Sequence, residues 1–193
     1  MKQIFLLFIL FSLISCSKDD DDTLTSINND GTGGMSCLVN GKVLVPYRTG
    51  FGNPPKFFGF SNDDDIYYFA LGIRHENSGI GDDQNLNIQV YDIDYRDPIT
   101  FQPISLAGNT YQLGSYGDSN LNGQFQTFGL YRDGRIDNGF YTTTDLINGE
   151  VKITYHDIEN YIIAGTFWFD AINENGEMVE IRDGRFDIEF TGL

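Results

Sequence analysis

Positive charge is scarce in this sequence. The 193 residues contain 12 lysines and arginines against 28 aspartates and glutamates, which gives a formal net charge of −16 at pH 7. Nucleic acids and anionic lipid headgroups both require a positive patch on the protein that binds them. The composition therefore argues against nucleic acid and against anionic headgroups as partners of this chain.

Metal-binding side chains and catalytic motifs are scarce as well. The chain has two cysteines and two histidines, and a zinc site would need further nitrogen or sulfur ligands. We find no G-x-S-x-G, H-E-x-x-H, phosphate-binding loop or dinucleotide fingerprint. The sequence therefore predicts no enzyme, no catalytic residue and no cofactor. A pair of dispersed carboxylates leaves no local motif, so a carboxylate-dependent hydrolase acting on glycans is the alternative.

The apolar run at the N-terminus is too short to span a bilayer, which takes roughly 20 residues. Residues 4–14 (IFLLFILFSLI) follow a single positive charge at Lys2, a pattern typical of a signal peptide. The run ends on Leu13-Ile14-Ser15-Cys16, which resembles the lipobox of bacterial lipoproteins. That resemblance implies cleavage before Cys16 and anchoring to a lipid bilayer through palmitate and related acyl chains on this cysteine.

The residues after Cys16 resemble an export signal followed by a linker. Ser17-Lys18 followed by Asp19–Asp22 resembles the acidic export signal of Bacteroidota lipoproteins. The resemblance implies that the protein is exported to the outer face of the outer membrane. The alternative is that the aspartates form a solvated spacer. Residues 23–34 (TLTSINNDGTGG) are polar and glycine-rich, which predicts a flexible tether. The expected organisation is a signal peptide over 1–15, lipidated cysteine and tether over 16–34, and one domain over 35–193.

Alternation of apolar and polar residues predicts an all-β domain, a single antiparallel β-sandwich or a barrel-like fold. Asn40-Gly41 supplies the positive φ angles of a tight hairpin turn between strands at 35–39 and 43–46. Further strands are expected at 56–60, 66–74, 86–91, 125–131 and 140–143, followed by a four-strand meander at 150–155, 162–171, 177–181 and 185–190. A turn at Arg182-Asp183-Gly184 is expected to separate the last two strands.

Side-chain parity sorts the meander into two faces. Ile163, Gly165, Phe167, Phe169 and Ala171 form the expected core face, continued by Phe186, Ile188 and Phe190, while Asp187 and Glu189 are expected to face water. Trp168 and Asp170 lie on the opposite face from Phe167 and Phe169. If that face is open, Trp168 beside Asp170 is a candidate platform for a sugar or a partner chain; if a second sheet covers it, Trp168 belongs to the core. Cys37 is expected to be a small buried apolar residue.

The terminal segments also resemble a family of flavobacterial lipoproteins of uncharacterised function. The resemblance rests on Val39-Asn-Gly41, Gly149-Glu-Val-Lys-Ile-Thr154, Ile163-Ala-Gly-Thr-Phe-Trp-Phe-Asp-Ala171 and Val179-Glu-Ile-Arg-Asp-Gly-Arg-Phe186. Residues 51–145 match only loosely. The resemblance implies the fold and the location and carries no catalytic residue.

Carboxylates and histidines supply the remaining candidate sites. Asp118-x-Asn120-x-Asn122-Gly123 matches the first half of an EF-hand calcium loop, but the twelfth position is Gly129 instead of the bidentate glutamate. The other clusters of oxygen donors are Asp63–Asp65, Asp82–Asp83 and Asp92, Asp94 and Asp97. A polar hairpin loop is the simpler explanation of the first, and solvated loop charge is the commoner explanation of the others. His75-Glu76 and His156-Asp157 are the two pairings of imidazole with carboxylate.

The sequence as a whole predicts an outer-membrane lipoprotein exposed at the cell surface. Its function is expected to be binding, adhesion or envelope assembly, with a glycan or an envelope protein as partner.

Overall fold

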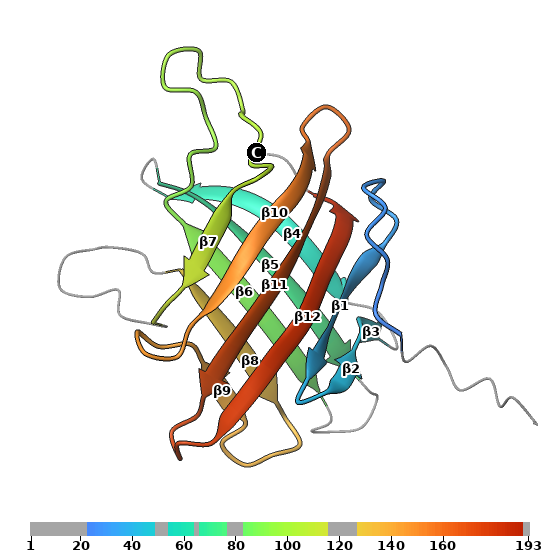
Figure 1. Cartoon of the computed structure of the whole chain (residues 1–193), viewed down its shortest axis with the longest axis vertical. Coiled ribbons are helices and arrows are strands. Elements are labelled where there is room, and N and C mark those ends of the chain that lie inside the picture. The colour runs from blue at the N-terminus through green and yellow to red at the C-terminus, as the bar shows by residue number, and fades with distance from the viewer. Residues whose placement is uncertain (1–22, 49–53, 64–65, 77–82, 116–126, 191–193) are drawn as a thin grey trace, which may run out of the picture.

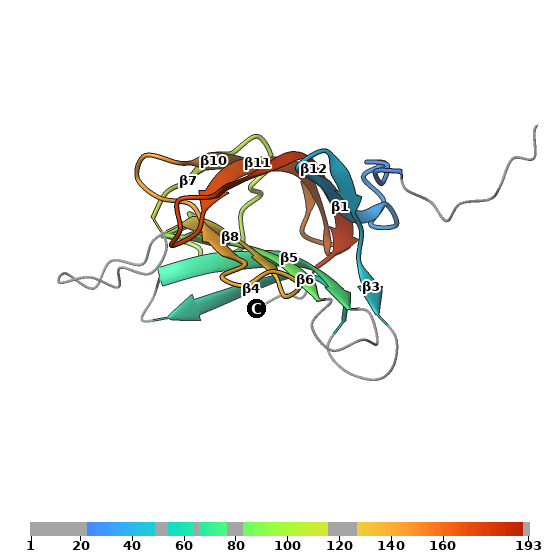
Figure 2. The same cartoon turned by 90° about the horizontal axis from the view of Figure 1, so that it is seen from below.

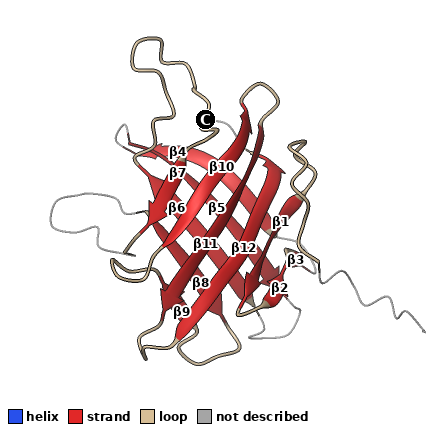
Figure 3. Cartoon of the chain, viewed as in Figure 1, coloured by secondary structure: helices blue, strands red, loops and turns tan. Residues whose placement is uncertain are grey.

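The computed structural model describes residues 23–48, 54–63, 66–76, 83–115 and 127–190. All regular structure in these ranges is β-strand, as Figure 3 shows. The strands are β1 (Gly34–Val39), β2 (Lys42–Leu44), β3 (Tyr47–Arg48), β4 (Lys56–Asp63), β5 (Ile66–Glu76), β6 (Gln84–Tyr91), β7 (Thr110–Leu113), β8 (Phe128–Asp133), β9 (Phe140–Thr142), β10 (Gly149–Asp157), β11 (Ile162–Ile172) and β12 (Met178–Glu189). No helix able to cross a membrane occurs among these residues.

The twelve strands form one continuous sheet that folds over into two layers. One layer contains β7, β10, β11, β12 and β1, with β2 at its edge, and the other contains β4, β5 and β6 (Figures 1 and 2). Strands β8 and β9 connect the layers, since β8 pairs with β6 and β9 pairs with β11 through Thr142 and Ile172. All pairings are antiparallel except that of β3 with β5. The predicted all-β, sandwich-like class is confirmed.

The core lies between the two layers and is rich in phenylalanine. Phe69 from the β4–β6 layer and Phe169 and Phe186 from the other layer are fully buried. The Phe58 ring bridges the layers, with its centroid 5.0 Å from that of Phe69 and 5.7 Å from that of Phe186. Parity had assigned Phe169 and Phe186 to the core, and both assignments are confirmed. Cys37 is also fully buried, and burial raises the pKa of its thiol to about 12.

The opening hairpin follows the prediction. Asn40 and Gly41 connect β1 to β2 with φ angles of 48° and 77°, the combination that a two-residue turn of this kind requires. Two short strands were not predicted. β3 has two residues and β7 has four, so neither is long enough to show an alternating pattern.

The predicted turn at Arg182-Asp183-Gly184 is wrong. These residues lie inside β12, which pairs with β11 on both sides of a bulge where Phe167 faces Gly184 and Phe169 faces Ile181. The positive φ of this stretch, 50°, belongs to Asp183. A bulge inserts an extra residue and leaves the strand running on. The predicted four-strand meander is therefore three strands, β10, β11 and β12.

Part of the predicted tether is bound to the domain. The backbone N–H groups of Asn28 and Asn29 donate to Oδ2 of Asp187 at 2.6 and 2.7 Å, and that of Gly31 donates to Oδ1 at 2.8 Å. The Thr25 N–H also donates to the Ser36 hydroxyl at 2.9 Å. Asp187, expected to face water, is fully buried under this segment. Residues 25–31, which we call the N-terminal strap, lie along β12 because a buried carboxylate needs hydrogen-bond donors.

Candidate functional site

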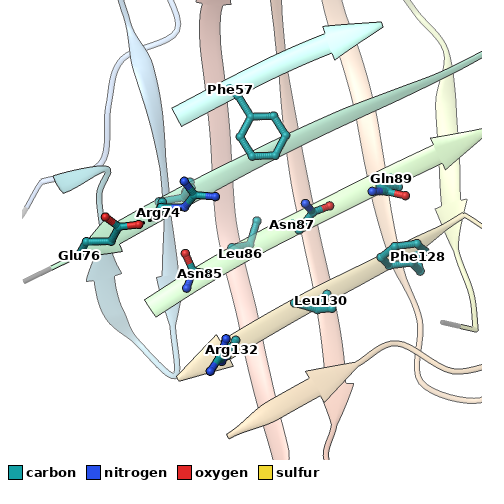
Figure 4. Close-up of a pocket in the computed structure, with 11 residues that line it drawn as sticks. Phe57, Arg74, Glu76, Asn85, Leu86, Asn87, Gln89, Phe128, Leu130 and Arg132 are labelled. Carbon is teal, nitrogen blue, oxygen red and sulfur yellow. Dashed lines mark ion pairs between the residues drawn. The ribbon is translucent and has the colours of Figure 1, made fainter. Parts of the chain in front are cut away.

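A groove of about 500 Å³ crosses the outer face of β5, β6 and β8, with β4 along its edge. Strand alternation creates this face. Leu86, Ile88 and Val90 of β6 point into the core and are fully buried, whereas Asn85, Asn87 and Gln89 point outward and are half-buried. The same register brings outward residues of the neighbouring strands alongside them, as Figure 4 shows. We call this site the amide groove.

Gly72 of β5 makes room for one wall of the amide groove. Gly72 pairs with Phe57 of β4 on one side and with Asn87 of β6 on the other. A Cβ atom at Gly72 would lie 2.5 Å from the Phe57 ring and 2.8 Å from the Leu86 carbonyl oxygen. The Phe57 ring therefore occupies the space above Gly72 and forms an apolar wall of the groove (Figure 4).

The opposite wall comes from β8. Leu130 pairs with Asn87, and Phe128 pairs with Gln89. Each outward amide of β6 thus lies beside an apolar side chain, and both apolar residues are half-buried. Asn87 Oδ1 is shielded from solvent and has no hydrogen-bond partner among the described residues. A half-buried amide beside an apolar surface suits a ligand with both hydroxyl groups and apolar faces.

The two ends of this outer face differ in chemistry. Beyond Gln89, Tyr68 and Tyr91 stack with ring centroids 4.8 Å apart, and the Tyr91 hydroxyl donates to Gln89 Oε1 at 2.7 Å. At the other end, Arg74 and Arg132 both pair with Asn85, one from each side. Six residue steps along one strand separate Asn85 from Tyr91, about 20 Å. The face is therefore aromatic at one end, cationic at the other and lined with amides between them.

Among the described residues, one carboxylate lines the amide groove at its cationic end. Glu76 forms ion pairs of 3.3 Å with Arg48 and with Arg74. Glycoside hydrolysis requires two carboxyl groups facing the scissile bond. Glu76 alone, already paired with two guanidinium groups, does not provide that arrangement.

The predicted platform at Trp168 and Asp170 lies on the other layer of the sandwich. The Trp168 side chain is 38% exposed, so no second sheet covers it. Arg182 covers part of it, with its guanidinium carbon 5.7 Å from the ring centroid, and forms a 2.6 Å ion pair with Asp170. The indole and the carboxylate do lie on one outward face. Both already interact with the same arginine, which leaves less of this surface for a ligand.

His156 is a buried histidine in an aromatic cage. Its ring lies 5.7 Å from Phe60 and 5.2 Å from Phe190, between centroids. Nδ1 accepts the Leu106 N–H at 3.0 Å, while Nε2 is shielded and has no partner among the described residues. Burial lowers the His156 pKa to about 4, so the ring is neutral at pH 7.

The carboxylate next to His156 is engaged elsewhere. Asp157 accepts the N–H groups of Glu159 and Asn160 at 3.0 Å each, and these bonds hold the turn between β10 and β11. The other pairing is also structural, since His75 Nδ1 lies 3.0 Å from the Val45 carbonyl oxygen and Glu76 is bound to arginine. Neither pair has the geometry of an acid–base couple.

The calcium candidates Asp118, Asn120 and Asn122 lie outside the described residues, as do Cys16 and the Asp19–Asp22 run. Within the described ranges, no group of three histidine, cysteine or acidic side chains could hold a metal ion. Asp97 instead closes its own turn, accepting the N–H groups of Ile99 and Thr100 at 2.9 and 2.7 Å. These bonds lower the pKa of Asp97 below its usual value.

Sequence reasoning missed the amide groove. One signal was present, because Asn85, Asn87 and Gln89 alternate with apolar residues and so must share a face. The side chains that surround these amides come from strands that are distant in sequence. A local sequence pattern cannot predict which strands pair.

The comparison with known proteins identifies a family. Residues 74–187 match the family model described as Domain of unknown function (DUF6252). The matched stretch includes the β6 amides and Leu130, while Phe57 precedes it. No curated protein and no solved structure matches the chain. Since the family model matches more than half of the sequence, the chain belongs to the DUF6252 family, whose function is unknown.

Proposed function

We propose that this chain is a lipid-anchored surface protein of the outer membrane that binds glycans in its amide groove. The observation that carries the binding proposal is the row Phe57–Gly72–Asn87–Leu130, which places a half-buried amide between two apolar side chains. A sugar ring has apolar faces and hydroxyl edges, and this arrangement complements both. The stacked Tyr68 and Tyr91 rings continue the apolar surface.

The groove favours binding over the alternative of glycan hydrolysis. Glu76 is the carboxylate among the described residues of its lining, and two arginines form ion pairs with it. The groove is also favoured over the Trp168 face, because Arg182 occupies both Trp168 and Asp170.

Binding is tested by affinity electrophoresis of the full chain through gels that contain neutral or acidic polysaccharides. We expect at least one polysaccharide to retard the chain and Asn87→Leu to abolish the retardation, because leucine removes the donor and the acceptor at similar volume. Thr166→Leu is the control, since Thr166 is exposed on the opposite layer. Retardation by none of the polysaccharides, or equal retardation of Asn87→Leu, would contradict the proposal. Release of new reducing ends would favour hydrolysis instead.

The anchor is tested by metabolic labelling in the native host. The wild-type chain should incorporate a palmitate analogue and Cys16→Ala should not, because the thiol is the acylated atom. Replacing Asp19–Asp22 with alanine should keep the label but protect the chain from protease added to whole cells. Equal labelling of Cys16→Ala would rule out lipidation at this residue.

A further inference from the structure

The cationic end of the amide groove is unusual for this chain. With 12 basic residues against 28 acidic ones, the sequence as a whole repels anions. Yet Arg48 and Arg74 both pair with Glu76, and Arg132 lies two strands from Arg74, across Asn85. The formal charge of these four side chains is therefore positive.

The sheet places two of these arginines symmetrically about an amide. Arg74 on β5 and Arg132 on β8 are both register partners of Asn85 on β6, and two strand spacings separate their Cα atoms by about 10 Å. All three side chains line the same outward groove (Figure 4). A ligand group above Asn85 would thus lie between two guanidinium groups.

The two arginines differ in how they are engaged. Arg74 is 30% exposed and is held by Glu76, whereas Arg132 is exposed and forms no ion pair with any described residue. A guanidinium group binds a carboxylate or sulfate through two parallel hydrogen bonds. The Arg132 guanidinium group is therefore available to bind an anion through two hydrogen bonds. Arg74, which Glu76 positions, adds positive charge on the other side of Asn85.

We infer that the amide groove is selective for acidic glycans, whose carboxylate or sulfate group binds between Arg74 and Arg132 above Asn85. This inference rests on the proposed glycan-binding function and specifies its ligand class. The amides and aromatic side chains contact the sugar rings, and the arginine end recognises the acidic substituent.

The test compares matched polysaccharides that differ in charge, using calorimetry or affinity electrophoresis on the full chain. Polygalacturonate is paired with its methyl ester, and dextran sulfate with dextran. We expect the acidic member of one pair to bind at least tenfold more tightly, and Arg132→Ala to remove about tenfold of that affinity. Arg132→Lys should restore only part of the lost affinity, because an ammonium group cannot form two parallel hydrogen bonds to the anion. The pair that shows the preference identifies carboxylate or sulfate.

Arg185→Ala is the matched control, because Arg185 lies on β12 in the other layer. Equal binding of acidic and neutral members, with both lost in Asn87→Leu, would overturn the inference and leave glycan binding intact. No binding of any polysaccharide would overturn both. Equally tight binding of double-stranded DNA, or equal loss in Arg185→Ala, would show non-specific attraction of polyanions and would also overturn the inference.

Discussion

Gly184 is a residue that the core has no room to replace with a larger one. A Cβ atom there would lie 2.4 Å from two carbons of the Phe167 ring and 2.5 Å from the Phe167 carbonyl oxygen. Phe167 is buried in the core and cannot move aside without opening a cavity. The sequence placed Gly184 in a turn, but the structure places it at this close approach inside β12.

We therefore expect Gly184→Ala to lower the free energy of unfolding by about 1 to 3 kcal/mol, the range for overpacking a core. Gly114→Ala is the control, because the nearest atom to its added Cβ lies at 3.9 Å, an ordinary contact. Urea denaturation midpoints measure both. Equal midpoints for the two variants would show that β11 and β12 are not this close at the bulge.

His156 makes the stability of the fold depend on pH. Its pKa is lowered from 6.5 to about 4 in the folded protein, chiefly by burial, with Asp157 opposing the shift. A histidine with a lowered pKa stabilises the fold fully above pH 6.5, and this contribution is lost as the pH falls from 6.5 towards 4. The shift corresponds to roughly 3 kcal/mol.

The pH dependence of the unfolding free energy should differ between the wild type and His156→Phe. Between pH 7 and pH 4.5 the wild type should lose clearly more unfolding free energy than His156→Phe, which fills the cage of Phe60 and Phe190 without a titrating group. Carboxylates titrate in both chains, so their effect cancels. Identical pH profiles in urea denaturation would mean that the buried ring does not sense pH.

At the scale of elements, the N-terminal strap depends on one side chain. Asp187 accepts the N–H groups of Asn28, Asn29 and Gly31, and hydrogen bonds to a charged acceptor contribute about 1.5 to 3 kcal/mol each. Asp187→Ala should therefore release the strap from β12. Amide hydrogen exchange in residues 25–31 should accelerate at least tenfold.

Glu189→Ala is the control for the strap, because Glu189 is exposed two residues further along β12. Exchange in the strap should stay close to that of the wild type in this variant. Slow exchange in Asp187→Ala would show that the strap is held by contacts other than this carboxylate.

Local sequence patterns predicted where the strands and turns lie better than they predicted which side chains surround them. Alternation located the long strands and their core faces, and Asn40-Gly41 located the first turn, because both depend on neighbours in sequence. Gly184 was interpreted as a turn residue because a bulge and a turn both use residues with positive φ or no side chain. Only the pairing of β11 with β12 distinguishes them.

The amide groove could not be predicted for a related reason. Phe57, Gly72, Asn87 and Leu130 form one row through three separate strand pairings. Sequence analysis can place Asn87 on an outward face, but it cannot state which side chains flank it. It identified Trp168 instead, because a single tryptophan beside an acidic residue is visible without knowing the fold.

At the scale of the whole molecule, the two layers present different outer faces. One face carries the amide groove with its tyrosines and arginines, and the other carries Trp168 with Arg182 across it. Net charge argued against nucleic acid and anionic headgroups as partners, because both require a positive patch. The fold changes that conclusion locally, because β3, β5 and β8 bring three of the few basic residues to one end of one face.

The most direct test of the account compares one aromatic residue from each face. Affinity for the polysaccharide that retards the wild-type chain is measured by calorimetry for Phe57→Ala and Trp168→Ala. Phe57→Ala should lose at least tenfold in affinity, about 1.4 kcal/mol, because the groove loses its wall above Gly72. Trp168→Ala should stay within about twofold of the wild type, well under 1 kcal/mol. The reverse order, with binding lost in Trp168→Ala and kept in Phe57→Ala, would contradict the assignment of the ligand site to the amide groove.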